Sequence, residues 1–110
     1  MPDYKPPASL ESEQTVLGSI LVAPEKLKEI IELIRPEDFY RTAHSIIYQT
    51  MLDLLEADTP IDLVTVFSRL KEKGQVEKIG GEGFLAGLSS QVGFAVNIKH
   101  HAQVVHDKST

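Results

Sequence analysis

Apolar residues recur along this chain at the three- and four-residue spacing of an amphipathic α-helix. Two runs keep the spacing i, i+3, i+4, i+7 without a break: Leu27, Ile30, Ile31 and Ile34, and then Leu63, Val66, Phe67 and Leu70. No stretch alternates cleanly between apolar and polar residues, as a half-buried strand would. The pattern therefore predicts an all-α fold.

Capping residues and helix breakers divide the first half of the chain into three helices. The first is expected at residues 10–22, with Ser9 as its N-cap. Pro24 suits the start of the second, which carries the first unbroken stripe and ends before Pro36. The third is expected at residues 42–57.

Three more helices are expected in the second half. Asp62 is a candidate N-cap for the fourth, and Gly74 supplies a left-handed stop. Gly80 and Gly81 open the fifth, and Asn97 caps the sixth. The result is a compact bundle of about six short helices.

The inward faces of these helices predict an aliphatic core. Its expected members are Leu27, Ile31, Ile47, Leu54, Phe67, Leu70 and Leu88. Residues 1–8 are rich in proline and are expected to form an extended lead-in, so that the helical domain covers residues 9–110.

The charge balance argues against a nucleic-acid ligand. Acidic residues outnumber Lys and Arg by 16 to 11, which gives a formal net charge of -5. Phosphate binding needs clustered bases, so we expect weak DNA binding at physiological salt. The chain has no cysteine and no apolar run that could span a bilayer, and residues 1–7 lack the apolar segment that a signal peptide would need, so none is expected. It is expected to be a soluble, cytoplasmic protein without membrane contact.

Residue types that often carry chemistry are present, but none has the spacing of a catalytic, cofactor or metal site. The run Gly81-Glu82-Gly83 with Gly87 is one residue too long for a dinucleotide loop, and no strand precedes it. The histidines near the C-terminus lack the i+3 or i+4 spacing of metal ligands. His44 is expected to be a packed or capping residue, and acidic pairs such as Glu11 with Glu13 are expected to face water. No catalytic residue, metal ligand or cofactor site is therefore expected.

The segment 92–96 permits two interpretations. It is uncharged and apolar, and it includes Phe94 and Val96. It can hold the last two helices together as part of the core, or it can belong to a surface kept apolar for a partner.

Five short motifs, in the same order along the chain, resemble the N-terminal domain of DnaB-type hexameric replicative DNA helicases. Each motif is weak alone, but together they cover nearly the whole chain. They are Pro6-Pro7-x-Ser9-Leu10-Glu11-x-Glu13-Gln14-x-Val16-Leu17-Gly18, Phe39-Tyr40-x-x-Ala43-His44-x-x-Ile47-Tyr48, Pro60-x-Asp62-Leu63-Val64-Thr65-Val66, Ile79-Gly80-Gly81 and Ala95-x-Asn97-Ile98.

The resemblance implies a protein–protein interaction domain. In this family the domain is an all-helical collar on a hexameric ring, where primase docks through its helicase-binding domain and where the ring is assembled and loaded with a helicase loader. The ATPase domain, with its ATP and magnesium, follows a helical hairpin. The chain ends about where the globular part ends, so we expect a fragment without helicase activity that lacks part of the docking surface.

Family docking positions map to Glu11 on the first helix and Phe84 on the fifth. Two departures from the family pattern lie nearby: Gly93-Phe94-Ala95-Val96-Asn97 replaces a Pro-Thr-Ala-Ala-Asn type of turn, and His100-His101 stands where the family tends towards tyrosines. The candidate partner-binding residues are therefore Glu11, Phe84, Phe94, Val96, His100 and His101.

Two other functions compete with this interpretation. The first is a free-standing helical adaptor or regulator that binds nucleic acid, against which the acidic balance and the lack of a basic recognition helix count. The second is a small helical enzyme, for which no active-site constellation is present.

Overall fold

The computed structural model describes residues 9–92 and 97–109, and it is built from α-helices with short 3₁₀ turns between them. The six α-helices are α1 (Leu10–Val22), α2 (Leu27–Ile30), α3 (Thr42–Glu56), α4 (Leu63–Glu72), α5 (Gly81–Ser90) and α6 (Ile98–Ser109). The 3₁₀ turns are Pro24–Lys26, Pro36–Asp38 and Glu77–Ile79. The described residues contain no strand, so the predicted all-α fold is confirmed.

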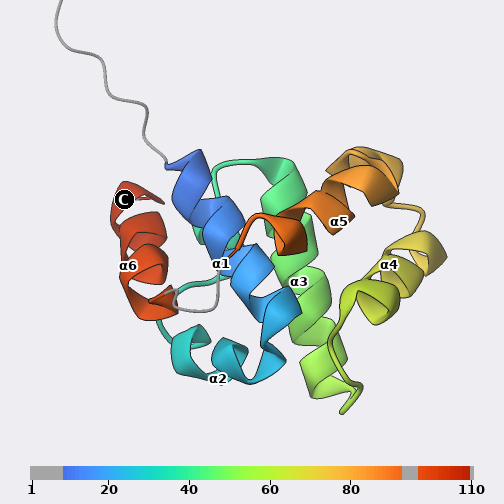
Figure 1. The fold of residues 1–110 in the computed structure, drawn as a ribbon, viewed down its shortest axis with the longest axis horizontal. Helices are drawn as coiled ribbons and strands as arrows, with labels where there is room; N and C mark the ends of the chain where they lie inside the picture. Colours follow the sequence, from blue (N-terminus) through green and yellow to red (C-terminus); the bar gives the residue numbers. More distant parts are fainter. Residues whose placement is uncertain (1–8, 93–96, 110) are drawn as a thin grey trace, which may run out of the picture.

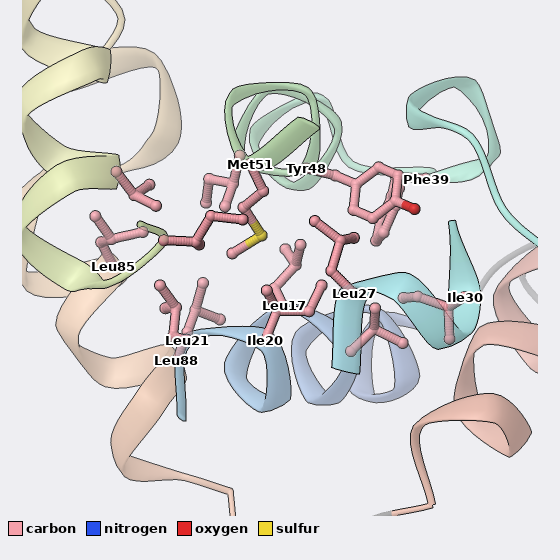
Figure 2. Close-up of a cluster of buried hydrophobic side chains, with 14 of the residues drawn as sticks. Leu17, Ile20, Leu21, Leu27, Ile30, Phe39, Tyr48, Met51, Leu85 and Leu88 are labelled. Carbon is pink, nitrogen blue, oxygen red and sulfur yellow. The ribbon is translucent and has the colours of Figure 1, made fainter. Parts of the chain in front are cut away.

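Helix α1 lies at the centre of the bundle. It packs against α6 on one side and against α3 and α5 on the other, and α4 covers the outer ends of α3 and α5 (Figure 1). The core lies between α1, α2, α3 and α5. Each helix contributes buried apolar side chains to it, such as Leu17, Leu27, Met51 and Leu88 (Figure 2). None of the described helices is both long and apolar enough to cross a membrane.

The predicted caps form as local hydrogen bonds. The Ser9 hydroxyl accepts the amide of Ser12 at 3.2 Å, and the Asp62 carboxylate accepts that of Thr65 at 2.8 Å. The Asn97 side-chain oxygen accepts the His100 amide at 3.2 Å. These bonds satisfy amide groups that the first turn of a helix leaves free, which explains why three boundaries were readable from sequence.

The second predicted helix is shorter than expected. Pro24 begins a 3₁₀ turn, regular α-helix lasts only from Leu27 to Ile30, and a turn follows. Leu27, Ile30 and Ile34 are buried, but Ile31 is 37 % exposed, so its assignment to the core is wrong. Ile31 sits at the edge of the stripe, about 100° around the helix from Ile30, and faces away from the packed helices.

Most of the other core assignments are confirmed. Ile47, Leu54, Leu70 and Leu88 are buried. Phe67 is only partly buried and packs against the edge of the core. Residues 1–8, predicted as an extended lead-in, lie outside the described part of the chain.

The two neighbouring isoleucines provide a test of this packing. Ile30→Ala should lower the free energy of unfolding by about 2–5 kcal/mol because it leaves a cavity in the core. Ile31→Ala should cost less than about 1 kcal/mol because its side chain already meets water. Urea unfolding of both variants, followed by circular dichroism, measures the difference. Equal losses would mean that α2 is rotated relative to the orientation described here.

Candidate interaction surface

The first two turns of α1 carry a buried carboxylate. The Glu13 side chain is only 1 % exposed. Its oxygens accept the backbone amide of Tyr40 at 2.7 Å, that of Arg41 at 3.4 Å and the Nδ1 of His44 at 2.7 Å. Glu13 therefore joins α1 to the beginning of α3.

This contact caps α3 from another helix. The N-cap position of α3 is Arg41, which makes no side-chain capping bond of its own. The first amide groups of a helix are partly positive and need an acceptor, and a carboxylate is a favourable one. Glu13 supplies that acceptor from a position about thirty residues earlier in the chain.

His44 is fully buried and connects this cap to α5. An ionised carboxylate can only accept a hydrogen bond. The proton of this bond is therefore on the Nδ1 of His44, which donates to Glu13. Its other nitrogen, Nε2, has no hydrogen-bond partner within the described ranges. The ring of Phe84 stacks on the imidazole, with 5.8 Å between ring centroids and an interplanar angle of 15°.

Gly80 helps to place the Phe84 ring. It adopts φ +101°, and a Cβ at this position would lie 3.2 Å from the Cβ of Phe84. A residue with a side chain would be strained in that backbone conformation and would also press on Phe84. The backbone conformation of Gly80, in the turn before α5, therefore helps to fix the position of the Phe84 side chain, which is a candidate docking residue.

The prediction that Glu13 faces water is wrong, whereas the prediction of a packed His44 is confirmed. A sequence signal existed for both. Glu13 precedes Val16, Leu17 and Ile20 at the spacing i, i+3, i+4, i+7, and all three are buried. His44 stands in the same relation to Ile47, Tyr48 and Met51. A polar residue at an apolar stripe position is expected to be buried with a partner.

Glu11, a predicted partner-binding residue, lies on the exposed side of the first turns of α1. Glu11 is exposed and lines a shallow hollow together with Gln14, Thr15, Gln91 and Val92. Because residues two apart on a helix point in roughly opposite directions, Glu11 faces away from the Glu13 contact. Glu11 and Phe84 therefore form two separate contact points.

Of the α6 candidates, one is fixed to α1 and the other is free to meet solvent. The Ser12 hydroxyl and the Nδ1 of His101 are 3.0 Å apart, and His101 is half-buried. His100 is exposed and meets the His101 ring edge-on, with 5.3 Å between centroids. Phe94 and Val96 lie outside the described residues. The structure thus brings Ser12, Glu11 and His101 to one end of α1.

The other end of α6 is held by Asp38. This carboxylate accepts the Arg35 amide at 2.9 Å and the Ser109 hydroxyl at 2.8 Å, and it lies 3.4 Å from the Nδ1 of His106. Partial burial alone would raise the pKa of Asp38, but the bonds from Arg35, Ser109 and His106 outweigh it and hold the pKa below its usual range. Its ionised form therefore helps to keep α6 against the rest of the domain.

Within the described ranges, no cluster of three or more His, Cys, Asp or Glu side chains has the arrangement of a metal site. The Glu13–His44 pair is enclosed, with both side chains at most 1 % exposed, so it holds structure rather than meeting a substrate. The candidate partner-binding residues that the structure describes lie outside this enclosed pair, with Glu11 and His100 exposed and Phe84 and His101 half-buried.

Comparison with known proteins shows which family shares this fold and these motifs. The family described as the DnaB-like helicase N-terminal domain matches residues 5–107. The replicative DNA helicase DnaB of Geobacillus stearothermophilus is 42 % identical over 104 residues, and the replicative DNA helicase DnaC of Bacillus subtilis is 41 % identical over 107 residues. These alignments cover 94 % and 97 % of this chain but only 23 % and 24 % of the relatives.

Two solved structures resemble the chain closely. The N-terminal domain of DnaB helicase from Mycobacterium tuberculosis superposes with a TM-score of 0.89 at 39 % identity, covering 96 % of this chain and 76 % of that one. A DnaB-like replicative helicase, described together with its interactions with primase, gives a TM-score of 0.81 at 35 % identity over 92 % of this chain and 24 % of that one. The chain spans about a quarter of the length of the curated relatives that it matches, and it belongs to the DnaB-like helicase N-terminal domain family.

Proposed function

We propose that this domain docks the helicase-binding domain of primase and takes part in assembling a hexameric replicative helicase. The observation that carries the proposal is the likeness to a DnaB-like replicative helicase described with its primase interactions, at 35 % identity and a TM-score of 0.81. At that identity over 92 % of the chain, the likeness extends beyond fold alone.

The proposed docking face has two parts. Glu11 offers an exposed negative charge beside the shallow hollow between α1 and the end of α5. Phe84 offers a half-buried ring on α5 whose position is set by Gly80 and His44. Preorganised aromatic side chains contribute much of the binding energy of protein interfaces, and exposed charges contribute to partner specificity.

We assign the other activities of a replicative helicase to the segments of the relatives that lie outside their match to this chain. ATP hydrolysis with Mg²⁺ and contact with DNA belong to the remaining three quarters of such a helicase on this proposal. The domain itself contributes contacts to neighbouring subunits and to the loader. Its net charge of -5 supports a role in binding proteins rather than nucleic acid.

Substitutions at the two docking positions test the proposal. Glu11→Lys and Phe84→Ala should each weaken binding of the cognate primase's helicase-binding domain by tenfold or more, about 1.4 kcal/mol, because one reverses a charge and the other removes a ring from the interface. Isothermal titration calorimetry with the full-length helicase that contains this domain measures the change. Val64→Ala is the control, since Val64 is 74 % exposed on α4 and belongs to neither part of the proposed docking face.

Circular dichroism must first show that both variants are folded, because a lysine in the first turn of α1 opposes the helix dipole. If the folded variants bind primase like the wild type, the assignment of the docking face is wrong. If the full-length wild-type helicase binds no primase, the proposed role of the domain is wrong.

A further inference from the structure

We propose that Phe84 and the cap of α3 form one coupled unit, so that a partner that displaces the Phe84 ring loosens the beginning of α3. This inference rests on the proposed docking function for its biological use, but the coupling itself is a property of the free chain. It extends the docking site inward, from an aromatic ring at the surface of α5 to the backbone amides of Tyr40 and Arg41, directly before α3.

The coupling runs through three direct contacts. Phe84 stacks on His44, His44 donates to Glu13 at 2.7 Å, and Glu13 accepts the Tyr40 amide at 2.7 Å. His44 and Glu13 are at most 1 % exposed, whereas Phe84 is half-buried. Of the three side chains that carry the coupling, Phe84, His44 and Glu13, only the ring of Phe84 is therefore accessible to a protein partner.

Movement of the ring has a defined chemical consequence. His44 has a buried Nε2 without a hydrogen-bond partner in the described structure, and the neighbouring Phe84 ring is apolar. Water that replaced the ring could bond to this nitrogen and would favour new orientations of the imidazole. Any rotation of His44 removes a donor from Glu13, on which the α3 cap depends.

Hydrogen exchange of backbone amides in the free chain decides whether the coupling exists. In Phe84→Leu, which keeps an apolar side chain but removes the ring, the amides of Tyr40 and Arg41 should exchange at least tenfold faster relative to that of Met51 in the middle of α3. The matched control is Phe67→Leu, which removes the ring of a second phenylalanine that is half-buried next to the core. Its general destabilisation should leave the ratio of the exchange rates unchanged.

Coupling is reciprocal, so a second measurement runs in the opposite direction. Glu13→Gln should shift the NMR signals of the Phe84 ring, whereas Glu11→Gln, on the outer side of the same helix turn, should not. An unchanged exchange ratio in Phe84→Leu, or unchanged ring signals in a folded Glu13→Gln variant, would overturn the coupling.

Adding the helicase-binding domain of primase separates the two proposals. Binding should raise the exchange ratio for Tyr40 and Arg41 in the wild-type chain. Binding through Phe84 without any change in the ratio would overturn the inference that docking loosens α3. If the full-length helicase that contains this domain does not bind primase, the proposed docking function fails, while the two measurements on the free chain still decide the coupling.

Discussion

Replacing Glu13 by alanine is expected to lower the free energy of unfolding by about 3–5 kcal/mol. The change leaves the buried His44 and the part-buried Tyr40 amide without their acceptor and opens a cavity beside them. A domain of this size has a total stability of roughly 5–15 kcal/mol, so the variant would keep only part of it. Urea unfolding followed by circular dichroism gives the value directly.

Two companion variants show whether the loss comes from the buried contacts. Glu13→Gln keeps one acceptor oxygen for the amides of Tyr40 and Arg41, but its amide group must face the Nδ1 of His44. His44 would then have to carry its proton on Nε2, which has no acceptor in the described structure. The expected loss is therefore intermediate, about 1–3 kcal/mol.

Glu11→Gln is the matched control for Glu13, since it removes the same charge from the same turn of α1 at an exposed position. Its loss should stay within about 0.5 kcal/mol, which is the usual range for surface substitutions. Equal effects at Glu11 and Glu13 would show that the helix dipole, and not the tertiary cap, explains the role of these acids.

Gly18→Ala is expected to destabilise the domain by about 3 kcal/mol, although alanine is normally the better helix residue. A Cβ at position 18 would overlap the carbonyl oxygen of Leu88 and lie 2.5 Å from the Cγ2 of Val92. The carbonyl is part of the backbone of α5, so it can yield only if the two helices separate. The close packing of α1 against α5 therefore depends on this glycine.

Glycines on α5 provide the control for this prediction. A Cβ added to Gly83 or Gly87 would meet nothing within 4 Å. Alanine at either position should raise the free energy of unfolding by about 0.5–1 kcal/mol, through the lower entropy of the unfolded chain. Thermal unfolding of the three variants shows whether each substitution stabilises or destabilises the domain. A stabilising Gly18→Ala would mean that α1 and α5 are further apart than described.

The sequence by itself determined the class of fold, most helix boundaries and the family. The reason is that Ser9, Asp62 and Asn97 bond to amides only three residues away, so that these capping signals lie within one turn of the chain. The apolar stripes predicted five of seven core residues for the same local reason. The motifs that resemble DnaB-type helicases also lie in short, continuous segments, and the match to the family over residues 5–107 confirms that interpretation.

Tertiary structure alone decided which of these residues meet. The Glu13–His44, Asp38–Ser109 and Ser12–His101 contacts join residues that are 31, 71 and 89 positions apart. Periodicity indicated that Glu13 and His44 lie on inward faces, but it did not indicate that they face each other. Likewise, the spacing of Ile31 did not reveal which edge of α2 would lack a packing neighbour. Helix propensity alone would predict that Gly18→Ala stabilises the domain, which is opposite to the effect expected from the packing of α1 against α5. Local rules describe one helix at a time, whereas these properties depend on how the other five α-helices of the described structure pack around α1.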